Sequence, residues 1–265
     1  AKLKPNMKEL ASEPMQIQGL PDGFKEGPYA FKHNNKYYLT FPWVQDKTET
    51  LAYAMADSPM GPFTFTGIIM DESPSGCWTN HHSITEYNGQ WYLFYHHNDY
   101  SPNFDKNRSA RIDSLFFNTD GTIKKVKPTL RGVGITDARS KIQIDRYSTI
   151  SPYGVTIDYL EPSNTFEGWQ TLFNRAGTWV TYNKVDFGTT PVKRLKARVR
   201  SEKGGAITLR TPGEKGMTIA ELPIKPTGKW TEISTNVSNA PTSMQDLIIT
   251  QTGENPVAVD WISFE

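Results

Sequence analysis

Short segments in which apolar and polar residues alternate recur along the chain, and turns rich in Gly, Pro, Asn and Asp separate them. Alternation at every second residue is the pattern of a half-buried β-strand, whereas an amphipathic helix repeats about every 3.6 residues. No helical period of useful length occurs in the first half, and alternation returns in the second half. The sequence therefore predicts an all-β protein.

Two hairpins of the first half follow the same pattern. Residues 24–41 contain an acid before a Gly-Pro corner, a strand, an Asn-Asn turn and a returning strand, and residues 80–95 repeat the strand, turn and strand around an Asn-Gly turn. The equivalent residues Tyr38 and Tyr92 are 54 residues apart, slightly more than the roughly 40–50 residues of a four-stranded propeller blade. We therefore expect a partial β-propeller of two blades. Their strands are expected at 28–31, 36–41, 50–56 and 63–70, then at 81–86, 90–96, 110–117 and 122–126.

A second domain is expected after residues 127–134, which show no alternation and are typical of a linker. Many short antiparallel strands over about 130 residues indicate a β-sandwich of jelly-roll type. The predicted domains are therefore a propeller part at 1–134 and a sandwich at 135–265. The expected sandwich strands are 141–147, 177–182, 192–200, 206–210, 217–224, 229–237, 244–251 and 257–264.

Composition narrows the range of partners. A formal net charge of +1 with 22% charged residues offers no electrostatic case for nucleic acid, and no apolar run reaches membrane length. Aromatic residues make up 12% of the chain, including 7 Trp, and such side chains are suited to sugar binding. Cys77 is the single cysteine, so no internal disulfide is expected. Because the chain opens at Ala1 without a signal-peptide pattern, we expect a processed or excised product.

Two corners of the repeat could carry chemistry. Glu26 lies just before the first strand, where Tyr29, Trp43 and Trp78 could wall a carboxyl group that serves as a general acid. The alternative is a turn carboxylate that caps backbone amides. His81 and His82 occupy the equivalent corner of the next blade, where strand alternation allows only one of them to face a shared site. An ordinary polar loop is the alternative there. Both corners fall at the same phase of the repeat, and equivalent propeller loops converge on the central axis.

The stretches 24–42, 49–70, 77–98 and 108–121 together resemble the second half of a glycoside hydrolase family 43 catalytic domain. This resemblance implies a five-bladed β-propeller and an inverting enzyme that removes xylose or arabinose from plant polysaccharides. It implies that Glu26 is the general acid and that His82 is the axial histidine that holds a calcium ion or water. Arg108 would be the basic residue near the sugar, with Arg111 as the alternative.

The resemblance leaves the general base unassigned. An inverting hydrolase needs a second carboxyl group roughly 6.5–9.5 Å from the acid, and the family draws it from a blade that precedes this sequence. Asp46, Asp71 and Asp99 are available acids, but loop solvation explains each of them. We therefore expect the chain to be inactive alone. Its two blades would need the missing N-terminal half of the propeller, or self-association with a second copy, to cover their apolar faces.

The stretches 141–147, 176–182 and 259–264 resemble carbohydrate-binding module family 6. The resemblance implies that Gln143, Asp145 and Asp260 bind a structural calcium ion, and that Phe173 and Trp230 clamp a sugar ring. Residue 258 is Ala where the family has a sugar-binding Asn. A packing role for the two aromatic residues therefore stays open.

Together these features predict a glycoside hydrolase of the β-xylosidase or α-L-arabinofuranosidase type. It would be secreted or periplasmic and act on hemicellulose, with plant cell-wall oligo- or polysaccharides as partners. The alternative is a non-catalytic carbohydrate-binding protein.

Overall fold

The computed structural model describes residues 1–78, 80–98, 106, 108–214 and 216–265. It divides into two compact units, Ala1–Thr129 and Leu130–Glu265, and the division falls within the expected linker at 127–134. The described residues form strands, turns and two short 3-10 helices, η1 (Ile144–Arg146) and η2 (Thr165–Glu167). No helix in the described part of the chain has the length and apolar character needed to cross a membrane. The all-β prediction is confirmed.

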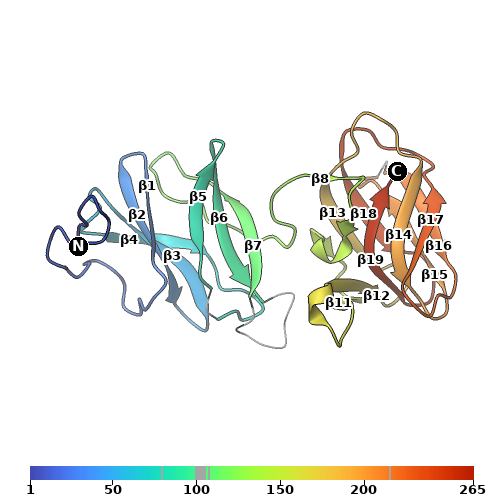
Figure 1. Cartoon of the computed structure of the whole chain (residues 1–265), viewed down its shortest axis with the longest axis horizontal. Coiled ribbons are helices and arrows are strands. Elements are labelled where there is room, and N and C mark those ends of the chain that lie inside the picture. The colour runs from blue at the N-terminus through green and yellow to red at the C-terminus, as the bar shows by residue number, and fades with distance from the viewer. Residues whose placement is uncertain (79, 99–105, 107, 215) are drawn as a thin grey trace. The chain divides into compact units, whose positions relative to one another are not determined.

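The first unit contains two antiparallel sheets in which neighbours along the chain pair with one another (Figure 1). One has the order β1-β2-β3-β4 and the other the order β5-β6-β7. The strands are β1 (Tyr29–His33), β2 (Lys36–Val44), β3 (Glu49–Ala56), β4 (Thr64–Met70), β5 (Ser83–Tyr87), β6 (Gln90–His97) and β7 (Ser109–Leu115).

The two predicted hairpin turns are present and have the same backbone geometry. Asn34 and Asn35 have φ angles of 45° and 62°, and Asn88 and Gly89 have φ angles of 49° and 77°. Two consecutive positive φ values are the requirement of a type I′ turn, whose twist matches that of the flanking strands. Asn and Gly tolerate this left-handed region best, so these turns set the register of β1 with β2 and of β5 with β6.

The strand expected at 122–126 is wrong. Within the described residues, only an isolated bridge between Phe117 and Ile123 forms there. The backbone N–H of Ile123 instead donates to Tyr53 Oη at 3.0 Å, and that of Val126 donates to the carbonyl of Ile69 at 2.7 Å. The segment also turns back on the residues that follow β7, where the backbone N–H of Lys124 donates to the carbonyl of Phe116 at 2.8 Å. It thus bonds to both sheets without forming a regular strand, and its apolar side chains Ile123 and Val126 are buried in the core that the sheets share.

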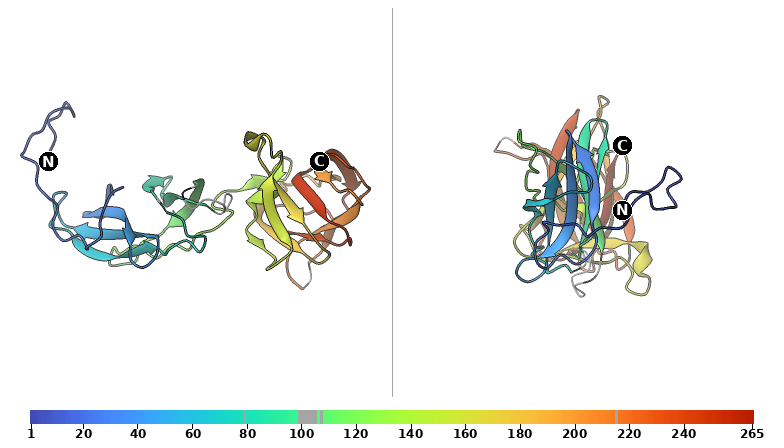
Figure 2. Two further views of the ribbon diagram at one scale, coloured as in Figure 1. Left: turned by 90° about the horizontal axis from the view of Figure 1, so that it is seen from below. Right: turned by 90° about the vertical axis from the view of Figure 1, so that its left-hand side faces the viewer.

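The two sheets lie side by side and share an apolar core (Figure 2). In β2, alternate residues point to opposite faces, so Tyr38 faces the second sheet while Leu39 and Phe41 belong to a cluster on the other face. Phe31 stacks on Tyr38 with ring centroids 4.7 Å apart and lies 5.2 Å from Trp91 of β6. This aromatic packing holds β1 next to the start of β6.

The second unit is a sandwich of two six-stranded sheets. One has the path β10-β13-β18-β15-β16, with β8 paired to β13, and the other the path β11-β12-β19-β14-β17, with β9 paired to β19. The strands are β8 (Thr136–Asp137), β9 (Ile142–Gln143), β10 (Thr149–Ile150), β11 (Val155–Tyr159), β12 (Trp169–Phe173), β13 (Trp179–Asp186), β14 (Arg194–Arg200), β15 (Gly205–Arg210), β16 (Thr218–Ile224), β17 (Thr231–Asn236), β18 (Met244–Gln251) and β19 (Val257–Phe264).

Alternation along β14 shows how this sandwich is built. Leu195, Ala197 and Val199 are fully buried in the core between the sheets, and the basic residues between them point outward. The central strand β19 is buried along its whole length. The predicted jelly-roll sandwich is therefore confirmed as a two-layer β-sandwich.

Candidate active site and carbohydrate-binding surface

The two corners selected from the sequence meet at the contact between the sheets of the first unit. Gly27, which follows Glu26, has a φ of 66°. A Cβ atom at Gly27 would lie only 2.6 Å from Cδ2 of His81. Only glycine therefore allows the Glu26 corner to approach the histidine corner this closely.

His82 is held against the first sheet. Its Nε2 lies 2.6 Å from Oγ1 of Thr40 in β2, and its ring lies 6.4 Å from that of Tyr29. The Thr40 hydroxyl donates to the carbonyl of Tyr29 at 3.0 Å, so it must accept from His82 Nε2–H. Burial, and to a smaller extent the charge of His81, lowers the pKa of His82 from 6.5 to about 4. The ring is thus neutral at ordinary pH, with its lone pair on Nδ1.

The Nδ1 atom of His82 is buried and has no hydrogen-bond partner among the described residues. A buried acceptor without a partner is costly. The neutral tautomer therefore offers one nitrogen that could bind a water molecule or a cation.

An open pocket of about 400 Å³ lies at this end of the second sheet. It is lined by His81, His82, Ser83, Phe94, Tyr95, His96, Arg108 and Ala110. The expectation that only one of the two histidines, His82, faces the shared site and His81 points away is wrong, because both line this pocket. β5 begins only at Ser83, so strand alternation does not apply to them. The structure thus brings His81, His82 and Arg108 together.

Arg108 and Arg111 differ in environment. Arg108 is exposed and lines the pocket just before β7. Arg111 is buried in β7, and its Nη1 donates to the carbonyl of Thr129 at 3.3 Å. Of the two alternatives, only Arg108 faces the pocket.

The other candidate site residues of the first unit, Glu26, Trp43 and Trp78, do not line this pocket. Glu26 is exposed and does not line the pocket. Trp43 belongs to the apolar cluster on the far face of the first sheet, where its Nε1 donates to the carbonyl of Asp22 at 2.8 Å. Trp78 is half-buried between β4 and β5. Neither tryptophan lines the His82 pocket.

The acids considered as bases are surface residues. Asp71 forms an exposed ion pair with Lys125 at 2.7 Å, and Asp46 is exposed. Asp99 lies outside the described residues.

The expected calcium ligands of the second unit include two buried carboxylates. Asp145 and Asp260 are buried, and burial is the main cause of the raised pKa of each. The negative charge of Asp260 raises the pKa of Asp145 further, so the two groups are close. Gln143 is exposed and pairs with Trp261 across β9 and β19. Arg146 and Arg198 each bond to one carboxylate, at 3.1 and 2.6 Å.

A cation would relieve the cost of burying these two charges, and oxygen ligands suit calcium. Asp145 and Asp260 therefore fit such an ion. The described residues contain no cluster of three or more His, Cys, Asp or Glu side chains placed to hold a metal, so amide or backbone oxygens would have to complete the site.

The expected aromatic clamp is not formed. Phe173 is fully buried in the sandwich core, so its ring is not accessible to a sugar. Trp230 carries two guanidinium groups over its ring, those of Arg198 at 5.3 Å and Arg200 at 5.1 Å. Ala258 is buried in β19, opposite Arg200 and Leu172.

Comparison with known families matches both units. Residues 1–123 match the model of glycosyl hydrolases family 43, and residues 151–265 match that of carbohydrate binding module family 6. The first part of the chain thus matches the family 43 model and the second part matches the family 6 model. Both resemblances noted from the sequence are confirmed.

Curated relatives match most of the chain or a part of it. The chain is 28% identical over 258 residues to an arabinoxylan arabinofuranohydrolase from Paenibacillus polymyxa, covering 86% of this chain and 40% of that protein. It is 43% identical over 109 residues to a β-xylosidase from Xylanibacter ruminicola, covering 40% of this chain and 32% of that protein. The chain thus spans less than half the length of these relatives.

A solved structure shares the fold. It is a family 43 arabinoxylan arabinofuranohydrolase from Bacillus subtilis in complex with cellotetraose, with a TM-score of 0.61 and 24% identity, covering 99% of this chain and 58% of that one.

Two residues that hold the histidine corner of this pocket in place were not predicted from the sequence. Thr40 is the partner of His82, and Glu49 at the start of β3 accepts from the backbone N–H of Asn80 at 2.6 Å. Glu49 therefore fixes the loop that carries the histidines. Only the long-range contact of the two sheets identifies these residues, since neither stands in a local motif.

Proposed function

We propose that the chain is part of a glycoside hydrolase of the xylosidase or arabinofuranosidase type that acts on hemicellulose. The observation that carries this proposal is the pocket in which His82 and Arg108 meet beside the Glu26 corner, within a family 43 segment. The names of the relatives support the sugar class. Since plant polysaccharide lies outside cells, a secreted or periplasmic location goes with this function.

In the proposed mechanism, Glu26 protonates the departing glycosidic oxygen. Its exposed position before β1 leaves it accessible to a substrate. Neutral His82 keeps its Nε2–H on Thr40 and uses Nδ1 to orient a water molecule or a calcium ion near the sugar. Arg108 donates hydrogen bonds to sugar hydroxyls from the other side of the pocket.

An inverting reaction also needs a base that activates the attacking water. We propose that another segment supplies it, either the N-terminal half of the propeller or a second copy, and that the chain alone does not hydrolyse glycosides. The relatives are more than twice as long as the part that this chain spans, which is consistent with a contribution from further blades.

The test compares Glu26→Gln with Glu86→Gln, an exposed control on β5. Both are assayed on aryl and alkyl xylosides and arabinofuranosides, with and without the N-terminal half. Loss of the acid should lower the rate by about 10²–10⁴-fold on alkyl substrates, whose leaving groups need a proton, and by less on aryl substrates. Equal losses on both substrate types would contradict the role of Glu26. Polysaccharide binding without hydrolysis in the completed protein would favour a non-catalytic carbohydrate-binding protein.

We also propose that the sandwich binds polysaccharide and holds a structural calcium ion on Asp145, Asp260 and the amide oxygen of Gln143. The support is the buried pair of carboxyl groups, because burial disfavours their charged form and a cation would compensate for it. Bound calcium would stabilise the folded unit because the unfolded chain has no preformed site. The melting temperature should therefore fall in chelator, and an unchanged value would contradict the proposal.

A further inference from the structure

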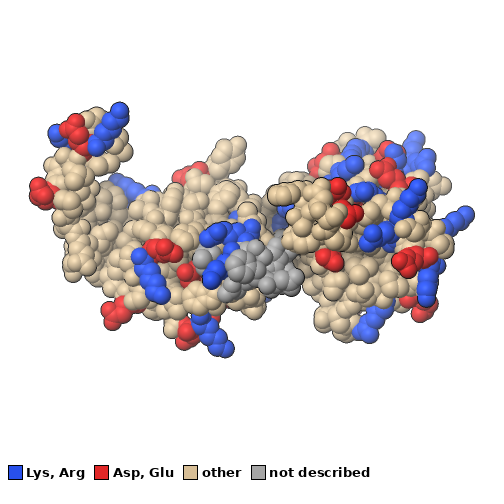
Figure 3. Space-filling view, turned by 60° about the horizontal axis from the view of Figure 1, so that its bottom comes forward, with Lys and Arg blue, Asp and Glu red and all other residues tan. Residues whose placement is uncertain are grey.

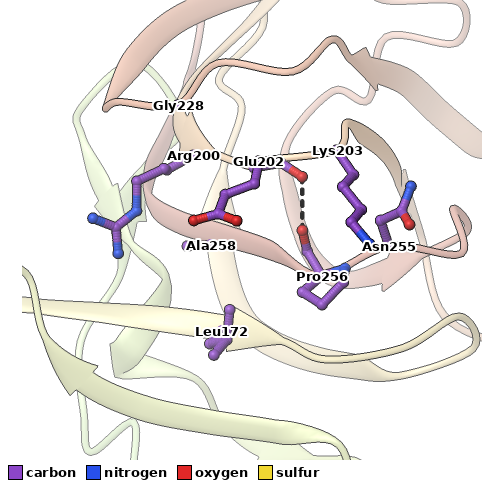
Figure 4. Close-up of a pocket in the computed structure, with 9 residues that line it drawn as sticks. Leu172, Arg200, Glu202, Lys203, Gly228, Asn255, Pro256 and Ala258 are labelled. Carbon is purple, nitrogen blue, oxygen red and sulfur yellow. Dashed lines mark hydrogen bonds between the residues drawn. The ribbon is translucent and has the colours of Figure 1, made fainter.

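A second pocket, of about 500 Å³, lies on the sandwich (Figure 4). It is lined by Leu172, Arg200, Ser201, Glu202, Lys203, Gly228, Asn255, Pro256 and Ala258. These residues come from β12, β14, β19 and the loops next to β14, β17 and β19. Glu202, Lys203 and Asn255 were not considered in the sequence, since they stand in loops without a recognisable motif.

The floor of this pocket has the small side chain of Ala258 at its centre. Leu172 and Arg200 both lie opposite Ala258 in the strand register, so the three residues form one row across β12, β19 and β14. Val199 and Phe173, the neighbours of this row, are buried in the core, and the row therefore faces outward. The methyl group of Ala258 leaves space that a larger side chain would fill. A sugar ring could pack its C–H groups against Leu172, Ala258 and Pro256.

Arg200 is held by contacts other than a close ion pair, although its charge helps to lower the pKa of the exposed Glu161 carboxyl group. Its guanidinium lies 5.1 Å from the centre of the Trp230 ring, and its Nη2 makes a long bond of 3.5 Å to Gln170. The adjacent Arg198 pairs with Asp260 at 2.6 Å, whereas no ion pair of Arg200 is found within the described residues. On the face of this unit shown in Figure 3, Lys and Arg lie among Asp and Glu, so that face has no large patch of a single charge.

Polar groups of both kinds surround this arginine. In Figure 4, Glu202 extends toward Ala258 between Arg200 and Lys203, and Lys203 extends toward Asn255. The pocket thus combines two cations with one carboxylate. Glu202 can accept from sugar hydroxyls, Asn255 can both donate and accept, and the cations can donate.

We propose that this pocket binds a hexuronate residue, a pyranose that bears a carboxylate, within an acidic polysaccharide. The inference rests on the carbohydrate-binding function proposed for the second unit. Arg200 binds the sugar carboxylate through its planar fork, which Trp230 preorganises. Glu202 accepts from a ring hydroxyl, and Lys203 with Asn255 binds the other oxygens. Net positive charge at the pocket favours the acidic sugar over a neutral one.

The test measures binding of the full chain by calorimetry to a uronate-substituted xylo-oligosaccharide and to the same oligosaccharide with its carboxylate reduced to an alcohol. We expect the acid to bind about 10–100-fold more tightly, and Arg200→Gln to remove this difference. High salt should reduce the preference. Glu202→Gln should increase it, because the variant removes a repulsive charge. Arg194→Gln is the matched control, since Arg194 lies on the same strand outside the pocket and bonds to Ser234.

If Arg200→Gln fails to fold, the exposed Lys203→Gln variant provides the second measurement, with an expected loss of severalfold for the acid alone. Equal affinity for both ligands in the unmodified chain would overturn the uronate preference and leave neutral sugar binding intact. Binding of neither ligand would overturn both the preference and the proposed binding function of the sandwich. An Arg194→Gln loss equal to that of Arg200→Gln would show a general charge effect and also overturn the proposal.

Discussion

The neutral state of His82 allows a quantitative prediction. Burial lowers its pKa from 6.5 to about 4. At a pH of about 5.5, only about 3% of this side chain would therefore carry a proton, compared with about 90% of a histidine with the ordinary pKa. Acid titration is thus a direct probe of how tightly the His82 corner packs on Thr40 and Tyr29.

The same pKa sets the sign of a stability effect. Between the pKa of about 4 in the folded chain and 6.5 in the unfolded chain, the unfolded state binds more protons. The free energy of unfolding therefore falls as the pH falls through this window, and the full contribution is present above it. At about 1.4 kcal/mol per pKa unit, the loss amounts to about 3 kcal/mol.

Two measurements check this reasoning. An NMR titration of the His82 ring, assigned with His82→Gln, should give a midpoint near 4. Denaturant unfolding of the first unit should show the unmodified chain losing about 3 kcal/mol relative to His82→Gln between neutral and acidic pH. Thr40→Val keeps the His82 ring but removes its hydroxyl partner. This variant therefore measures the contribution of the hydrogen bond separately from the effect of protonation. A midpoint near 6.5, with a free-energy difference independent of pH, would refute the buried, neutral histidine.

Three further predictions concern packing and the metal site. Gly27→Ala should destabilise the first unit by about 1–3 kcal/mol in denaturant unfolding, because its backbone is left-handed and its Cβ would meet His81; unchanged stability would mean that the two corners are not in contact. Phe173→Ala should cost about 3–5 kcal/mol of unfolding free energy, whereas weaker sugar binding at full stability would indicate an accessible ring. Asp145→Asn should abolish the calcium-dependent rise in melting temperature. In chelator, stability of the unmodified chain should fall as the pH rises through the raised pKa of Asp145, and the variant should lack that slope.

Local sequence signals predicted the hairpins well. An Asn-Asn or Asn-Gly pair between alternating segments needs little beyond its own backbone preference to form a tight turn, and both turns have positive φ at their two central residues. Alternation in β14 likewise predicts which side chains are buried. These features depend on residues close together in the chain, so the sequence alone is enough to predict them.

Features that depend on distant contacts were not predictable in the same way. Residues 122–126 have an apolar pattern that suits a strand, but their backbone hydrogen bonds are divided between residues 116–118 and the other sheet, where Tyr53 and Ile69 accept. Phe173 stands where the family resemblance implies a sugar contact, yet packing between the two sandwich layers buries it. In both cases the alternating pattern shows that a side chain is apolar but not which surface it will cover.

The contact between the two sheets of the first unit links stability to the chemistry of the site. His82 directly precedes β5 of the second sheet, but its hydrogen-bond partner Thr40 belongs to the first sheet. The desolvation that keeps the ring neutral exists only while the sheets are packed. The aromatic cluster around Phe31, Tyr38 and Trp91 supplies much of that packing. A substitution in this cluster, away from the pocket, should therefore raise the pKa of His82 toward its ordinary value as the sheets separate. The site is thus a property of the sheet interface rather than of either hairpin, because neither sheet alone provides both the ring and the surface that buries it.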